Sequence, residues 1–174
     1  MAIDSFLKID TIPGESADSA HKDEIELSSF YFEEANSGSF AAGGGGGSGK
    51  VKMNNFEFTA RSCKASPKLM FACATGQHIP SATLTCRKAG GGQQDFFMVK
   101  FTDVLVSKYV LGSSLRDGSS ESQGEVQGYA EGAPMDRFAL NFAKIEFEYK
   151  PQKADGSLDS PVKTGYSLKE NKAV

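Results

Sequence analysis

The segment Arg137–Lys150 limits the possible folds more than any other, because apolar residues occupy alternate positions within each of its halves. Alternation with a period of two is typical of a strand that buries one face. In the first half the apolar residues lie at even-numbered positions: Phe138, Leu140 and Phe142. In the second half they lie at odd-numbered positions: Ile145, Phe147 and Tyr149. Such a change of phase predicts a bulge at which the strand turns a corner, as strands of small barrels do.

Several other segments have the same alternation and are predicted to be strands. They are Phe6–Ile9, Glu24–Phe32, Val51–Thr59, Ala82–Lys88, Phe96–Val106 and a short segment around Tyr166 and Leu168. In Glu24–Phe32 the apolar residues also change from odd-numbered to even-numbered positions, between Leu27 and Phe30, which predicts a second bulge. With one short strand near Val126, we expect seven or eight strands, mostly joined by turns.

Ser66–Gly76 is the one segment predicted to be helical. Ser66 is a favourable N-cap, Pro67 suits the first helical position, and Gly76 suits the left-handed residue that ends a helix. A stripe of apolar residues at helical spacing predicts the face that packs on the core: Leu69, Met70 and Cys73.

The chain of 174 residues is predicted to form a single domain over residues 1–174. Its 19 glycines and 13 phenylalanines, without tryptophan, suit turns between aromatic strands better than a helical bundle. The expected fold class is mainly β: a compact antiparallel β-barrel, or two tightly packed sheets, with one short flanking α-helix. Gly112–Pro134 is rich in Gly, Ser and Glu, and we expect it to be a long exposed loop.

The glycine-rich stretch Ser37–Lys50 contains five consecutive glycines and has two possible interpretations. Gly44–Lys50 matches the G-x-x-x-x-G-K core of a phosphate-binding loop. However, Val51 replaces the Ser or Thr that would bind magnesium, and the strand expected there provides no helix N-terminus for phosphates. We therefore prefer the other interpretation, an extended loop whose run of glycines, without side chains, can lie against the backbone of another chain.

No arrangement typical of catalysis occurs in the sequence. The two histidines, His21 and His78, have no cysteine or carboxylate cluster at metal-ligand spacing, and there is no G-x-S-x-G motif. A Cys–His pair that meets only in the folded chain is an open alternative, but Cys73, the nearest candidate, lies in the apolar stripe. We therefore expect no enzyme activity, no cofactor and no metal site.

Charge and hydropathy argue against further classes of function. The net charge of −3 and a pI near 5.5 leave no basic surface for nucleic acid or for an anionic membrane. Residues 1–8 lack the basic leader and apolar run of a secretory signal, and no segment has transmembrane length. Three cysteines without an export signal argue against a disulfide framework: Cys63, Cys73 and Cys86. We expect synthesis in the cytoplasm and, in the event of export, no cleaved signal peptide.

Sequence blocks characteristic of a known family occur in order over nearly the whole chain. They are Phe6–Ile9 with Ile12–Ser16, Gly43–Val51, Ser66–Leu69 with Gly76–Pro80, Ala82–Leu84 with Arg87–Gly91, Leu140–Phe142 with Pro151–Gly156, and Gly165 with Tyr166. In order and spacing these blocks resemble the haemolysin-coregulated protein (Hcp) family. The resemblance implies a β-barrel with a flanking helix that assembles into hexameric rings. In that family the rings stack into the inner tube of the bacterial type VI secretion system and are secreted with effectors.

The resemblance implies roles for two sets of residues. The candidate contact between stacked rings is the glycine-rich stretch: Ser39, Phe40, Ala41, Ala42, Gly43, Gly44, Gly45, Gly46, Gly47, Ser48, Gly49 and Lys50. Tyr31 stands where family members usually have a small residue, and it is the candidate contact with effectors in the ring lumen.

Three hypotheses about function follow. The leading one is a structural tube subunit whose partners are further copies of itself and the spike, sheath and effector proteins of the system, without nucleic acid or membrane insertion. The alternative is a chaperone or receptor that holds effectors inside the same ring. The third, a nucleotide-dependent enzyme, would use Gly44–Lys50 and is the one that Val51 argues against.

Overall fold

The computed structural model describes residues 3–36, 51–88, 93–112 and 134–174, and six of their strands close into a barrel. Around the barrel the order is β8, β5, β2, β1, β6 and β7, and β7 pairs again with β8. Every neighbouring pair is antiparallel. The bounds are β1 Ile3–Ile9, β2 Ile25–Tyr31, β5 Phe56–Arg61, β6 His78–Lys88, β7 Asp95–Gly112 and β8 Met135–Tyr149. The mainly β fold class is confirmed, and of the two arrangements expected the chain forms the closed barrel.

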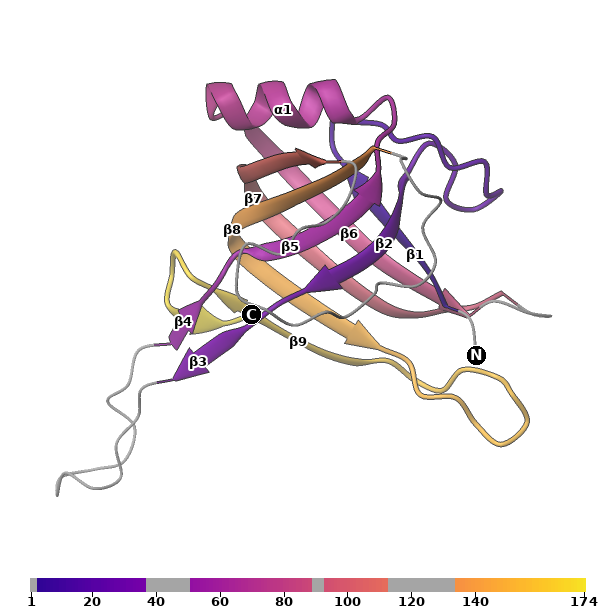
Figure 1. Cartoon of the computed structure of the whole chain (residues 1–174). Coiled ribbons are helices and arrows are strands. Elements are labelled where there is room, and N and C mark those ends of the chain that lie inside the picture. The colour runs from indigo at the N-terminus through magenta and orange to yellow at the C-terminus, as the bar shows by residue number, and fades with distance from the viewer. Residues whose placement is uncertain (1–2, 37–50, 89–92, 113–133) are drawn as a thin grey trace, which may run out of the picture.

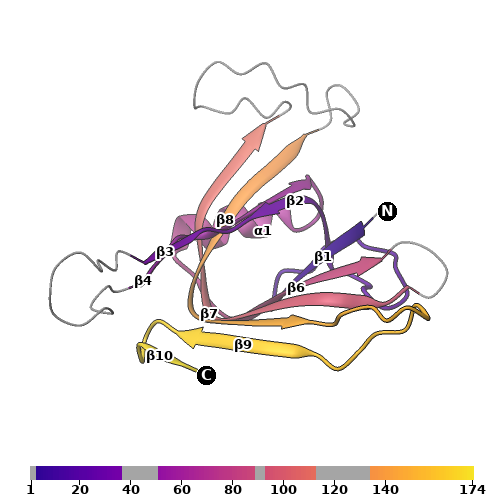
Figure 2. The same ribbon diagram turned by 90° about the horizontal axis from the view of Figure 1, so that it is seen from below.

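Four shorter strands extend the barrel, so the described residues contain ten strands rather than the seven or eight expected. β9 (Val162–Ser167) adds to the second half of β8, and β10 (Lys172–Ala173) adds to β9. β3 (Glu34–Asn36) and β4 (Val51–Met53) form a separate two-stranded ribbon. This ribbon projects away from the barrel in both views (Figure 1, Figure 2). We call it the arm.

Stacked phenylalanines fill the barrel. Phe58 has almost no exposed surface, and its ring stacks on those of Phe56 and Phe138, with centroids 5.0 and 5.4 Å apart. Phe101 of β7 meets Phe56 and Phe58 edge to face. These rings come from three strands that are distant in sequence, so their burial holds the closed sheet together.

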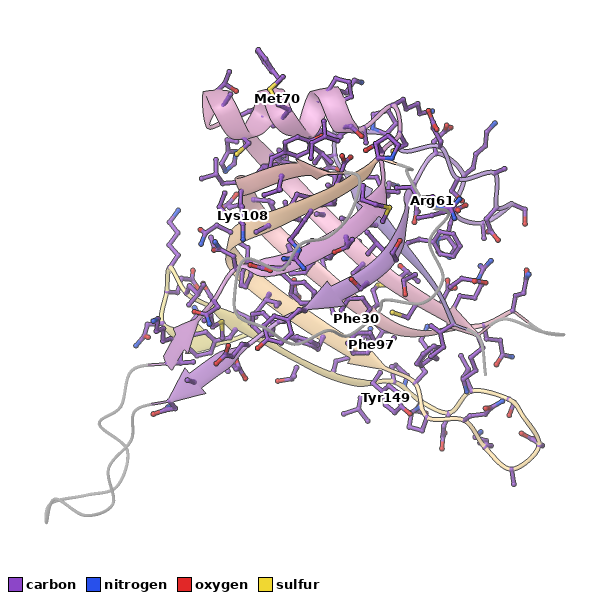
Figure 3. All side chains as sticks on the ribbon, viewed as in Figure 1. Phe30, Arg61, Met70, Phe97, Lys108 and Tyr149 are labelled. Atoms are coloured by element: carbon purple, nitrogen blue, oxygen red, sulfur yellow. The ribbon has the colours of Figure 1, made fainter. Side chains whose placement is uncertain are left out.

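The helix α1 (Ser66–Thr75) lies across one end of the barrel, next to β7 (Figure 1). Gly76 ends it with a φ of 65°, as predicted. The predicted N-cap is wrong: Ala65 holds that position, while the Ser66 hydroxyl donates to Asp136. The predicted core stripe is also partly wrong, because the buried helix residues are Leu69 and Ala72, whereas Met70, labelled in Figure 3, is half exposed.

One of the two predicted bulges is confirmed. The register between β2 and β5 shifts between Leu27 and Ser29, where the apolar parity of β2 changes. In β8 the prediction of a bulge is wrong, because Phe142 and Ile145 stay in one register with β7. The strand changes its neighbour instead: residues 135–140 pair with β5, and residues 144–149 pair with β9. β7 changes phase opposite this point, from the buried Phe101 to the buried Val104, and Asp103 between them has a φ of 55°, so both strands turn here without a change of register.

The strand predicted over Val51–Thr59 is two strands. Val51–Met53 belongs to the arm, and Phe56–Arg61 belongs to the barrel. Asn54 and Asn55 separate them: the N–H of Asn54 donates to the Glu33 carbonyl, and the Asn55 side chain accepts from Asn141. The apolar residues change from odd-numbered to even-numbered positions between Met53 and Phe56. That change was the signal in the sequence that one strand ends and another begins.

A buried arginine ties the loop between β1 and β2 to the barrel. Arg87 of β6 donates from Nε to Asp95, at 2.9 Å, and from Nη1 to Asp18, at 3.0 Å. Burial favours the neutral guanidine, but the hydrogen bond and charge of Asp95 and the charge of Asp18 together raise the pKa of Arg87. Asp18 in turn accepts hydrogen bonds from the backbone N–H groups of Ala20 and His21. One guanidinium thus fixes a loop that is distant in sequence.

His21 completes this cluster. Its ring is buried and stacks on Phe6, with centroids 4.4 Å apart. Nδ1 lies 2.9 Å from a carboxylate oxygen of Glu24, and Nε2 lies 3.2 Å from Asp95. The loop therefore covers the outward face of β1 with a packed aromatic pair.

Candidate self-association surface

One side of the barrel is a layer of four strand segments. From one edge to the other they are residues 106–112 of β7, residues 135–140 of β8, β5, and β2. We call this the four-stranded layer, and Figure 1 shows it as the strands β7, β8, β5 and β2 from top to bottom.

The two edges of this layer have no strand partner among the described residues. β1 pairs with β2 only at Ile25 and Glu26, which leaves residues 27–31 open on that side. β6 pairs with β7 only as far as Leu105, which leaves residues 106–112 open on the other side. We call these stretches the β2 edge and the β7 edge. Unpaired backbone N–H and C=O groups of this kind are a template for another strand.

Both edges expose large apolar side chains. On the β2 edge, Phe30 is 38% and Tyr31 is 59% exposed. On the β7 edge, Val110 is 44% and Leu111 is 61% exposed. Large apolar side chains gathered on an exposed edge are typical of a contact with another protein.

A groove of about 550 Å³ lies between the β7 edge and α1. It is lined by Ser62, Cys63, Ser66, Pro67, Met70, Tyr109, Leu111 and Pro134. Most of this lining is apolar, so the groove suits an apolar side chain better than a charged ligand.

A buried carboxylate holds the walls of the groove together. Asp136 of β8 accepts hydrogen bonds from Ser62 Oγ, at 2.8 Å, from Tyr109 Oη, at 3.0 Å, and from the hydroxyl of Ser66. These donors belong to the loop before α1, to β7 and to α1 itself. Burial and the hydrogen bond to Asp136 raise the pKa of Tyr109 from 10.0 to about 12.

We expect Tyr109 to make the chain sensitive to alkali. Its pKa is higher in the folded chain than in the unfolded chain, so its contribution to stability is complete below pH 10 and is lost as the pH rises toward about 12. In Tyr109→Phe, the free energy of unfolding should fall less steeply between these pH values than in the wild type. Urea titrations at several pH values measure this slope.

Tyr31, the candidate cargo contact, lies on the outward face of the four-stranded layer. Its cross-strand neighbour is Glu57, whereas the next residue, Phe30, lies opposite the buried Phe58. The Tyr31 hydroxyl donates to Glu33 at 3.0 Å, and this bond raises the pKa of Tyr31. Its aromatic ring is therefore available on an outer surface.

The candidate stacking residues, Ser39–Lys50, lie outside the described residues, as do residues 113–133, the interior of the predicted long loop with the strand near Val126. The residues on each side of the glycine-rich stretch are the strands of the arm. Sequence reasoning identified neither open edge of the four-stranded layer. An edge is defined by which strands fail to pair, and alternation within one strand carries no such information.

Within the part of the chain that the structure describes, no group of three or more His, Cys, Asp or Glu side chains is placed to hold a metal ion. No helix in those ranges is both long enough and apolar enough to cross a membrane.

Comparison with known proteins identifies the family. A family model described as "Type VI secretion system effector, Hcp" matches residues 6–149. The chain is 40% identical over 172 residues to Protein hcp1 of Pseudomonas aeruginosa, with 98% of each chain covered. Hcp1 from Salmonella typhimurium aligns with a TM-score of 0.73 at 33% identity, over 99% of this chain and 100% of that one. A solved structure described as a type six secretion system protein aligns with a TM-score of 0.84 at 29% identity and the same coverage. The chain therefore belongs to the Hcp family of type VI secretion system proteins.

Proposed function

We propose that this type VI secretion tube protein acts as a structural, non-catalytic subunit that closes into hexameric rings. The rings stack into the inner tube and are secreted with effectors. Family membership over nearly the whole chain is the observation that carries the proposal. The two different open edges of the four-stranded layer support it, because a head-to-tail contact between unlike surfaces generates a closed ring.

The partners follow from this role. Within the tube they are other copies of the chain, and outside it they are the spike, sheath and effector proteins of the same system. The chain is made in the cytoplasm and leaves through the secretion machine without a cleaved signal peptide.

The arm and the glycine-rich stretch supply the contact between stacked rings. An isolated two-stranded ribbon is marginally stable in water, and every residue of β3 is exposed. A second ring that packs on the arm would stabilise it. Since residues 37–50 connect its two strands, they belong to the same contact.

A double substitution tests this stacking contact. In Gly45→Val with Gly46→Val, β-branched side chains restrict a backbone that glycine leaves free, so rings should form but not stack. Negative-stain electron microscopy of the purified protein distinguishes rings from tubes, and Ser48→Ala in the same stretch is the control. Tubes of normal length from the double variant would contradict the stacking role. Absence of rings in the wild type would contradict the proposed function itself.

A second function, holding effectors in the lumen of the ring, is not favoured by the comparisons and rests on Tyr31. The exposed ring of Tyr31 lies beside Glu57, and Lys108 approaches Glu57 at 3.6 Å. The outward face of the four-stranded layer thus offers aromatic and charged groups for a polar protein surface.

A further inference from the structure

We propose that a polar cavity beside the loop between β1 and β2 binds a basic amino-acid residue with a free carboxylate, as a free amino acid or as the last residue of a peptide. The cavity has a volume of about 440 Å³ and lies where this loop meets β2 and the end of β5. Three charged residues line it: Glu15, Glu26 and Arg61. Small-molecule sites in proteins typically have volumes of roughly 300–1,000 Å³, so one amino-acid residue fits.

Two opposite charges line this cavity without pairing. Glu26 of β2 and Arg61, the last residue of β5, are both exposed, and neither has an ion pair or a side-chain hydrogen bond with another described residue. Figure 3 labels Arg61 at the end of β5, next to the loop between β1 and β2. Arg87, by contrast, is bonded to two carboxylates. An unpaired guanidinium and an unpaired carboxylate in one cavity leave a donor and an acceptor for a ligand that carries both charges.

Hydrogen bonds within the chain hold three walls of the cavity in place. One carboxylate oxygen of Glu15 accepts from the backbone N–H of Lys64 at 3.0 Å. The buried Ser16 donates its N–H to the Glu24 carbonyl, also at 3.0 Å. Ser62, a further lining residue, donates its hydroxyl to Asp136. Because these groups are already ordered, a ligand pays little conformational entropy when it binds.

The bulge in β2 contributes to the shape of the cavity. In a regular strand, successive side chains point to opposite faces, yet the consecutive residues Glu26, Leu27 and Ser28 all line the cavity. The register with β5 shifts between Leu27 and Ser29, and Ser28 has no partner residue in β5. Bulges commonly re-aim a side chain next to a functional site. This bulge therefore adds Ser28 to the polar lining.

The charges and the lining select the chemical class of the ligand. Two carboxylates and one guanidinium leave a net negative charge, which disfavours phosphates and other anions. Burial, together with the charges of Glu15 and Asp136, raises the pKa of the Cys63 thiol, so this further lining residue adds no charge at neutral pH. None of the described lining residues is aromatic, so none can stack on a nucleobase.

A lysine residue with a free carboxylate has the complementary charges. Its carboxylate pairs with Arg61, and its side-chain ammonium lies between Glu15 and Glu26. The site belongs to a single chain, so this inference goes beyond the proposed function and does not depend on ring formation.

Calorimetric titration of the full chain with L-lysine tests the site. The wild type should give saturable heat, and Arg61→Gln and Glu26→Gln should each weaken binding by at least about tenfold, because each removes a charged partner of the ligand. Both side chains are exposed, so both variants should keep the circular dichroism spectrum of the wild type. Arg137→Gln is the matched control: Arg137 lies two residues after Met135, the cross-strand neighbour of Arg61, but does not line the cavity. It should leave the dissociation constant unchanged.

Two further probes assign the groups of the ligand and its source. Cadaverine is lysine without the carboxylate, so it should bind the wild type more weakly than lysine does. In Arg61→Glu three carboxylates line the cavity, and this preference should reverse. The tripeptide Gly-Gly-Lys distinguishes the two sources: tighter binding of the tripeptide assigns the end of a peptide chain, and tighter binding of L-lysine assigns a free amino acid.

Three results would overturn the proposal. They are the absence of saturable heat with both L-lysine and Gly-Gly-Lys, equal weakening by Arg61→Gln and Arg137→Gln, and an unchanged preference for lysine over cadaverine in Arg61→Glu. Each of them leaves the proposed function intact, because electron microscopy of the same samples reports on rings separately.

Discussion

Replacing Phe58 by alanine is expected to destabilise the chain by about 3–5 kcal/mol, the usual cost of removing a buried phenylalanine side chain. Phe58 contacts three other buried rings, from β5, β7 and β8. Each of these rings is carried by a strand that is paired on both sides, so the surroundings can fill the cavity only in part, and the cost should lie toward the upper end of the range.

Urea unfolding of wild type and variant at equal protein concentration measures this difference, because association adds to apparent stability. Phe71→Ala is the control: it removes the same side chain from the exposed face of α1, and the stability should change by no more than about 0.5 kcal/mol. A loss below about 1 kcal/mol in Phe58→Ala would show that these rings do not form a close-packed core.

Replacing Arg87 by methionine is expected to cost about 3 kcal/mol. Loss of one partner of a buried ion pair typically costs about 3–5 kcal/mol, and the lower end applies here because the Asp95 side chain is 32% exposed and partly solvated. The methionine side chain reaches as far as the position of the arginine Nε, so the change keeps the packing of the apolar stem while it removes the hydrogen bonds. Asp18 and Asp95 would then repel each other without the cation between them.

The loop between β1 and β2 should open before the barrel does. Hydrogen exchange of the Gly14, Ser16 and Asp23 amides, which bond within this loop, is therefore expected to accelerate in Arg87→Met. Lys64→Met is the control, since it removes a surface pair with Asp23 in which both side chains are about half exposed, and it should cost less than about 1 kcal/mol. Equal losses of stability in Arg87→Met and Lys64→Met would show that burial does not strengthen the contribution of Arg87.

Much of the fold was predictable because strand and helix periods are local properties. The end of α1 at Gly76 and the bulge in β2 depend on a few neighbouring residues, and both predictions are confirmed. The closing pair of the barrel was not predictable in the same way. Residues 135–140 of β8 pair with β5 and residues 144–149 pair with β9, and this change of neighbour involves residues far apart in sequence.

The candidate surface was less predictable. Tyr31 was identified by resemblance alone, and its place on the outward face depends on the register with Glu57. Arg87, Asp95 and Asp18 carry no motif, so only the folded chain brings them together. Ser66 was assigned to the helix start on its residue type, but the distant Asp136 competes for its hydroxyl.

The closure of the barrel has a consequence for the order of events in the cell. Ile3 pairs with Lys88, and Phe56 pairs with Leu140, so two of the strand pairs that complete the barrel join residues that are synthesised far apart. Sheets with such non-local pairing fold slowly, because the loop must close before the contacts form. The β7 edge exists as part of a layer only after β8 has docked beside it. We therefore expect each subunit to complete its barrel before it joins a ring, so that unfinished chains are excluded from the growing tube.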